Sequence, residues 1–128
     1  MRLLLDTCTF LWIVTGDASL SALAREHFSD PANEVFLSSV SAWEIAVKFG
    51  LGKLPLPRSP SALVPEERRR HQIQSLPLDE AAVLASAKLA ELHRDPFDRM
   101  LVCQAIMGGL TLLTPDPLIA QYPVATAW

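Results

Sequence analysis

Arg2-Leu3-Leu4-Leu5-Asp6 is the stretch that decides the fold of this chain. Its three leucines form an unbroken apolar run without the alternation of a half-exposed strand, and Asp6 ends the run. Such runs are typical of strands that are buried on both faces in a parallel sheet. The stretch therefore predicts an α/β fold in which helices cover both faces of a sheet.

Strands and helices alternate along the rest of the sequence. Further strands are expected at 34–38, 75–79, 110–114 and 124–126. Helices are expected at 19–28, 39–48, 80–93 and from Pro96 to the Gly108-Gly109 pair, with a short helix through Arg70 after a proline-rich loop at 54–65. This order predicts a three-layer α/β/α sandwich with a mainly parallel sheet of four or five strands.

Size and composition are those of one globular domain spanning residues 1–128. The sequence is 50% hydrophobic over 128 residues, which is enough for a single core. No stretch is long and apolar enough to span a membrane, and Asp6 interrupts any signal peptide. Cys8 and Cys103 are expected to be reduced, buried thiols in a cytoplasm. The net charge of −3 argues against coating nucleic acid by bulk charge, so any nucleic-acid binding must be local.

Four acidic residues lie where expected strands end or helices begin. These residues are Asp6, Glu44, Asp98 and Asp116. In a parallel sheet these places share one edge, the crevice outside the carboxyl ends of the strands. Carboxylates about 4–6 Å apart repel by a few kcal/mol per pair at an effective dielectric constant near 20. Such a cluster needs protons or cations, and oxygen ligands favour Mg²⁺ or Mn²⁺.

Two of these acids also have local explanations. Asp6 can cap a helical turn that begins at Thr7. Glu44 can complete a capping box with Ser41 or form an ion pair with Lys48. Each local explanation is sufficient when the residue is considered alone.

Asp98 and Asp116 have local explanations as well. Asp98 is at the third helical position after the expected cap Asp95, where a carboxylate is stabilised by the helix dipole. Asp116 stands between two prolines, as turn residues often do. The local explanations are independent of one another, whereas a metal site requires all four acids at one edge. We therefore favour the metal site.

Two ions roughly 3.5–4 Å apart would activate a water and stabilise the leaving oxygen of a phosphodiester. Asp6 and Asp98 are the expected direct ligands, Glu44 completes or bridges the site, and Asp116 binds the second ion or an ordered water.

Several other polar and aromatic residues are assigned supporting roles. Asp95 is a helix cap within reach of the site. Arg99 and Lys48 either hold phosphate or pair with a neighbouring acid. The remaining residues are expected to be structural or solvated, namely His27, His93, Trp12, Trp43 and Arg68–Arg70.

Five stretches of the sequence resemble the motifs of a known protein family. They are Leu4-Leu-Asp-Thr-Cys-Thr-Phe-Leu-Trp12, Ser38-Ser-Val-Ser-Ala-Trp-Glu-Ile-Ala-Val-Lys48, Gly52-Lys-Leu54, Leu92-His-Arg-Asp-Pro-Phe-Asp-Arg-Met-Leu-Val-Cys-Gln-Ala105 and Leu112-Leu-Thr-Pro-Asp116. Together they resemble a PIN domain of the VapC type, the toxin of bacterial VapBC toxin–antitoxin pairs. The resemblance covers nearly the whole chain in the expected order.

This resemblance implies a Mg²⁺- or Mn²⁺-dependent endoribonuclease that cleaves RNA and halts translation. It places the family's acidic residues on the four positions chosen above, as both catalytic and metal-binding residues. It also implies a homodimer and inhibition by a small VapB-type antitoxin. The sequence departs from the family at Cys8, where relatives often have His, and at Cys103, where Ala is usual.

Two alternatives remain open. One is a catalytically silent PIN-like interaction module, although all four acids are present. The other is a haloacid-dehalogenase-like phosphatase, which also begins with an apolar strand ending in Asp but requires a second Asp where this chain has Cys8.

Overall fold

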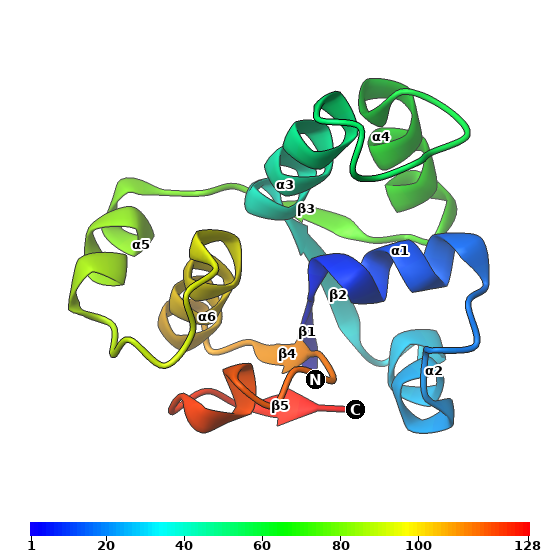
Figure 1. Ribbon diagram of the computed structural model, residues 1–128. Coiled ribbons are helices and arrows are strands. Elements are labelled where there is room, and N and C mark those ends of the chain that lie inside the picture. The colour runs from blue at the N-terminus through cyan, green and yellow to red at the C-terminus, as the bar shows by residue number, and fades with distance from the viewer.

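The computed structural model describes all 128 residues and contains one five-stranded sheet (Figure 1). The strands are β1 (Arg2–Leu5), β2 (Glu34–Ser38), β3 (Gln74–Leu76), β4 (Thr111–Leu113) and β5 (Thr126–Ala127), in the spatial order β3-β2-β1-β4-β5. Every neighbouring pair is parallel, with Leu4 of β1 beside Phe36 of β2 and Leu112 of β4. The run of leucines is therefore the central strand.

Six helices surround the sheet. They are α1 (Thr7–Thr15), α2 (Ala22–Ser29), α3 (Ser39–Gly50), α4 (Pro60–Arg70), α5 (Glu80–Ala85) and α6 (Pro96–Gly108), with short 3-10 turns η1 (Ser86–Lys88) and η2 (Ile119–Gln121). Figure 1 shows α5 and α6 on one side of the sheet and α1 and α2 on the other. None of the helices is both long and apolar enough to cross a membrane.

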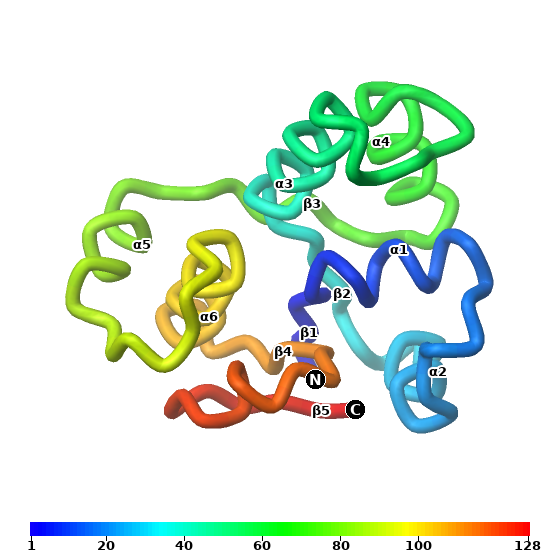
Figure 2. The backbone as a smooth tube through the Cα atoms, viewed as in Figure 1, coloured from blue at the N-terminus to red at the C-terminus, as the bar shows by residue number.

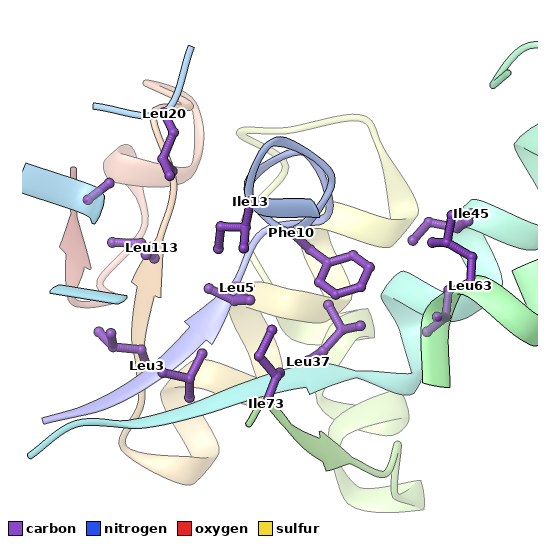
Figure 3. Close-up of a cluster of buried hydrophobic side chains, with 13 residues drawn as sticks. Leu3, Leu5, Phe10, Ile13, Leu20, Leu37, Ile45, Leu63, Ile73 and Leu113 are labelled. Carbon is purple, nitrogen blue, oxygen red and sulfur yellow. The ribbon is translucent and has the colours of Figure 1, made fainter. Parts of the chain in front are cut away.

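Successive leucines of β1 point to opposite faces of the sheet, and each face has its own core. Leu3 and Leu5 pack with Phe10 and Ile13 of α1 in a cluster that also includes residues of α2, α3 and α4 (Figure 3). Leu4 instead packs in a second cluster with residues of α6 and η2. The predicted three-layer α/β/α sandwich is confirmed.

The carboxyl ends of the central strands lead directly into helices. Asp6 caps α1 immediately after β1, and Ser38 caps α3 immediately after β2. The hydroxyl of Thr9 in α1 donates to the carbonyl of Leu113 at the end of β4, at 2.8 Å. Short connections of this kind place the first turns of α1 and α3 at the same edge of the sheet.

Several predicted boundaries differ from the structure, and one of them is the strand expected at 75–79, which lies at Gln74–Leu76. The loop expected at 54–65 contains the start of α4, because Pro60 suits the first helical turn and Pro65 is accommodated within the helix. For the helix expected at 19–28 the sequence left Ser19 or Ser21 as the cap; the helix begins at Ala22, and Ser21 is confirmed as its cap. The last strand lies at Thr126–Ala127 rather than at 124–126.

The largest error concerns the helix expected at 80–93. α5 ends at Ala85, and the chain then follows η1 and an irregular path to α6 (Figure 2). The face proposed for that helix, at Val83, Ala87 and Ala90, is exposed, while Ala82 is buried. The residues from 86 to 93 are instead held by the side chains of Arg99 in α6 and Tyr122, which follows η2.

Candidate metal centre

The four predicted acids line one cavity of about 280 Å³ at the carboxyl edge of the sheet. Asp6 follows β1, Glu44 lies in α3, Asp98 lies in the first turn of α6, and Asp116 follows β4. Asp95 and Lys48 line the same cavity. The structure thus brings together all four positions that the strand-end argument selected.

Asp6 is buried and fixed by two hydrogen bonds. Its carboxylate accepts the backbone N–H of Thr7 at 2.7 Å and the hydroxyl of Thr114 at 2.6 Å. Burial raises the pKa of the Asp6 carboxyl, and the carboxylate of Glu44 raises it further, while the two hydrogen bonds oppose the shift. The predicted capping role is confirmed, and the same side chain lines the cavity.

Glu44 does not belong to a capping box, so that local explanation is wrong. The cap of α3 is Ser38, and the hydroxyl of Ser41 accepts a hydrogen bond from Thr7 at 2.9 Å inside the site. The alternative explanation, an ion pair between Glu44 and Lys48 one helical turn away, is confirmed. Hydrogen bonding to Glu44 raises the pKa of Lys48, so the ammonium is retained.

One oxygen of Glu44 has no partner in the protein. The residue is only 5% exposed, and its Oε1 atom is buried without a hydrogen-bond donor. A buried carboxylate oxygen left in this state is costly unless a cation or water satisfies it. This atom is the clearest sign that the cavity is built for a ligand.

Asp98 experiences the repulsion that the sequence predicted. Its side chain follows the cap Asp95, which accepts the N–H of Phe97 at 2.9 Å. Burial raises the pKa of Asp98 to about 7, and the carboxylates of Asp6, Asp95 and Glu44 contribute to that rise. An acid that is half protonated near neutral pH in the absence of a cation is a ready site for one.

Asp116 is oriented by the turn that follows β4. Its N–H donates to the hydroxyl of Thr114 at 3.1 Å, and its Oδ1 atom accepts the N–H of Leu118 at 2.8 Å. Its other oxygen lies 2.9 Å from Nε2 of His93. Thr114 therefore connects Asp116 to Asp6.

His93, which the sequence analysis expected to be structural, contacts two of the four acids of the candidate site. Its Nε2 atom lies 3.1 Å from Asp98 as well as 2.9 Å from Asp116, and ligand atoms of these three residues all lie within 4.8 Å of one another. The available signal was its position two residues before the cap Asp95 in the family-like stretch. That spacing alone did not reveal a contact with Asp116, which is 23 residues away.

Arg99 does not form the predicted ion pair with a neighbouring acid. Its guanidinium donates to the carbonyls of Ala90 at 2.9 Å and Ser86 at 3.1 Å, and also reaches those of Leu89 and His93. With its donors directed at the backbone, Arg99 holds the irregular segment before α6 and does not pair with an acid.

The two cysteines are not joined by a disulfide, and Cys8 is only partly buried. Burial, followed by the nearby Asp6 carboxylate, raises the pKa of Cys8 to about 12, so its thiol stays protonated beside the acids. Cys103 is buried in α6. Neither replaces an acid in the cavity.

The donor set fits a hard divalent cation. Four carboxylates come together, one of them has an unsatisfied buried oxygen, and another has a raised pKa because of the others. A larger cavity of about 340 Å³ between α3 and α4 is lined by no carboxylate and no histidine. The acidic cavity is therefore the better candidate for chemistry.

Comparison with protein families gives a match over nearly the whole chain. The family model of the PIN domain matches residues 3–124. Ribonuclease VapC16 of Mycobacterium tuberculosis (strain ATCC 25618 / H37Rv) is 44% identical over 57 residues, which are 44% of this chain. The aligned part spans only 40% of the length of that relative.

Solved structures share the fold at low sequence identity. VapBC2 from Rickettsia felis, bound to a DNA fragment from its promoter, has a TM-score of 0.69 at 16% identity, over 99% of this chain and 98% of that chain. FitAcB from Neisseria gonorrhoeae has a TM-score of 0.56 at 20% identity, over 97% of this chain and 95% of that chain. These likenesses independently support the fold.

Proposed function

The chain belongs to the PIN domain family, and on that premise we propose that it is a divalent-metal-dependent endoribonuclease, the VapC-type toxin of a type II toxin–antitoxin pair. The observation that carries this proposal is the single cavity lined by all four predicted acids. The partial match to a protein named as a ribonuclease supports the choice of reaction. The family membership sets aside the haloacid-dehalogenase-like alternative.

In this proposal the acids hold Mg²⁺ or Mn²⁺. Asp6 and Asp98 are direct ligands, Glu44 completes the site through its unpartnered oxygen, and Asp116 serves a second position. When bound, the ions supply Lewis-acid activation of water and neutralise charge on the phosphodiester. We regard the whole chain, residues 1–128, as one catalytic domain.

The protein's own groups set the geometry for this chemistry. Thr7 and Thr114 hold Asp6 in one orientation by donating to its two oxygens. Lys48 limits the negative charge of Glu44 in the metal-free protein. Because both arrangements exist before a substrate arrives, little reorganisation is required when the phosphodiester enters.

The proposed substrate is RNA, bound locally rather than by bulk charge, since the net charge is −3. The proposed protein partner is a VapB-type antitoxin, and the fold shared with VapBC2 supports a search for it in the neighbouring reading frame. We also propose that the active form is a homodimer. Co-purification with the product of that reading frame and solution mass measurements test both assignments.

The activity is tested with purified protein, freed of any partner, and mixed cellular RNA in Mg²⁺, Mn²⁺ or EDTA. Wild-type protein is expected to cleave RNA only with a divalent ion. Asp98→Asn is expected to lower the rate on the order of 10³-fold, equivalent to about 4 kcal/mol. Glu26→Gln, an exposed acid of α2 that does not line the cavity, is the matched control and keeps full activity.

Three outcomes would contradict the proposal. Equal cleavage in EDTA would reject the metal mechanism. Asp98→Asn protein as active as the Glu26→Gln control would reject the site assignment. Purified protein that cleaves no RNA under any of these conditions but still binds its partner would favour the catalytically silent interaction module.

A further inference from the structure

His93 occupies the space between two proposed metal ligands without being one of the four acids. Its Nε2 atom lies 2.9 Å from Oδ2 of Asp116 and 3.1 Å from Oδ2 of Asp98. The side chain of His93 is only 12% exposed, so water does not readily replace these contacts. The imidazole therefore links the two carboxylates.

The other ring nitrogen identifies which atom carries the proton. Nδ1 of His93 lies 3.1 Å from the backbone N–H of Asp95 and accepts its hydrogen bond. An acceptor nitrogen has a free lone pair, so in the neutral ring the proton is on Nε2. Nε2–H consequently donates to the carboxylates of Asp98 and Asp116.

The backbone that carries His93 is held at several points. The hydroxyl of Tyr122 accepts the N–H of His93 at 2.8 Å and that of Leu92 at 3.1 Å, and donates to the carbonyl of Ala90 at 2.8 Å. Arg99 reaches the same hydroxyl at 3.3 Å. Tyr122 is 3% exposed, so this anchor is part of the core. The ring of His93 is thus attached to a fixed support.

We propose that His93 is a positioning residue whose Nε2–H holds Asp98 and Asp116 together and thereby sets the affinity of the metal position that they form. The inference rests on the proposed function, because it concerns the same cavity. Hydrogen bonds from outer groups to ligating carboxylates typically contribute about 10–100-fold to metal affinity. The donor also offsets the repulsion between the two acids when no ion is bound.

Direct coordination of an ion by Nε2 is the competing role, and the geometry disfavours it. Coordination would require a lone pair on Nε2 and a proton on Nδ1. The proton on Nδ1 would then point at the backbone N–H of Asp95. Two hydrogen-bond donors would face each other in a partly buried part of the protein. A ligand role would therefore cost a hydrogen bond that the donor role keeps.

The first test reads the tautomer in the metal-free protein. Long-range ¹H–¹⁵N correlation spectra of ¹⁵N-labelled protein in EDTA assign the proton to one ring nitrogen, and His93→Gln identifies the His93 signals by their disappearance. We expect the proton on Nε2. A proton on Nδ1 in the folded protein would overturn the proposal.

The second test measures Mn²⁺ affinity by titration followed with electron paramagnetic resonance. His93→Ala is expected to weaken binding by about 10–100-fold. His93→Gln is expected to restore affinity to within about threefold of wild type, since its amide nitrogen can also donate. His27→Ala, in α2 and outside the cavity, is the matched control and binds as wild type. Thermal unfolding verifies that each variant is folded.

The outcomes separate this inference from the proposed function. Wild-type and His93→Ala proteins that bind Mn²⁺ equally would overturn the positioning role and leave the metal-dependent nuclease intact. His93→Gln protein that binds as weakly as His93→Ala would also overturn it, because the imidazole nitrogen itself would then be required. Wild-type protein that binds no Mn²⁺ would contradict the proposed function, and the inference would fail with it.

Discussion

Two pairs of acids face the same cavity but are held in different ways. The buried pair, Asp6 and Glu44, is 5% exposed at each residue and has partners in α1, α3 and the end of β4. In the second pair, the side chains of Asp98 and Asp116 are 15% and 25% exposed and share the donor His93. The buried pair is fixed by the fold, whereas the second pair is more open to solvent and is linked through a ring on the segment before α6.

This difference affects how well the protein tolerates the charge of each acid before a metal ion binds. The pKa of Asp6 is also raised by burial, but two donors to its carboxylate oppose that shift before any cation arrives. Asp98 has a pKa raised to about 7 by burial and by its neighbours, so the protein tolerates its charge poorly without a cation. A cation is therefore expected to stabilise Asp98 more than Asp6.

Replacing the carboxylate of one acid from each pair by an amide should change the stability of the metal-free protein in opposite directions. Asp6→Asn loses a charged acceptor for Thr7 or Thr114 and is expected to destabilise the metal-free protein by about 2–3 kcal/mol. Asp98→Asn removes a repelled charge and is expected to stabilise the protein by about 1–2 kcal/mol at pH 8 after solvent screening. Urea unfolding in EDTA measures both. Changes of the same sign would remove the proposed distinction.

Thr114→Val is the next largest perturbation, because it removes one donor from the buried pair. The valine keeps the shape of the side chain, while Asp6 loses its hydroxyl partner and the N–H of Asp116 loses its acceptor. We expect a loss of about 2 kcal/mol in unfolding free energy. Thr111→Val, in β4 three residues before Thr114 and without a side-chain hydrogen bond, is the control and is expected to change stability little. Equal effects of the two substitutions would count against the role of the hydroxyl.

The pH dependence of stability should come mainly from Asp98. Its folded-state pKa of about 7 lies above the ordinary value of 3.8, so the folded protein holds more protons between these values than the unfolded chain does. Metal-free stability is therefore expected to fall as pH rises from about 4 to 7, and the raised pKa of Asp6 acts in the same direction.

Because solvent screens part of the interaction, the unfolding free energy of the metal-free protein is expected to fall by about 1–2 kcal/mol between pH 5 and pH 8. Denaturant titrations in EDTA at the two pH values measure it, and Asp98→Asn should reduce it. Stability of the metal-free wild type that rises over this interval, or an undiminished fall in Asp98→Asn, would contradict the assignment.

Lys48→Gln should give the smallest effect. Lys48 is partly exposed, and its ammonium pairs with Glu44, which the proposal assigns to the metal. Removing this positive charge is expected to tighten Mn²⁺ binding by about two- to fivefold, since screening limits the interaction. Lys53→Gln, exposed and outside the cavity, serves as control. Weaker binding in Lys48→Gln would mean that Lys48 orients Glu44 more than it competes with the ion.

The sequence predicted the sheet well because apolar runs constrain it strongly. The bounds of β2 matched the expectation of 34–38, and Asp95 and Pro96 marked the start of α6 as expected. The same argument brought the four acids to one edge, since strand ends in a parallel sheet share an edge whatever the details of the loops.

The rest of the site depended on contacts between distant residues. The helix expected at 80–93 stops early because the guanidinium of Arg99 and the hydroxyl of Tyr122 bind backbone groups of the segment after α5. Those same contacts hold His93 over Asp116. No local pattern encodes such pairings, so the role of His93 was not predictable from its spacing.

The central claim is that the four acids form one divalent-cation site, and a crystal of the protein soaked with Mn²⁺ tests it most directly. Anomalous scattering should place at least one manganese within coordination distance of Asp6 and Asp98, and its occupancy should fall sharply in Asp98→Asn crystals. Ordered manganese bound elsewhere, with none between Asp6 and Asp98 in crystals of protein that cleaves RNA only with Mn²⁺, would contradict the claim.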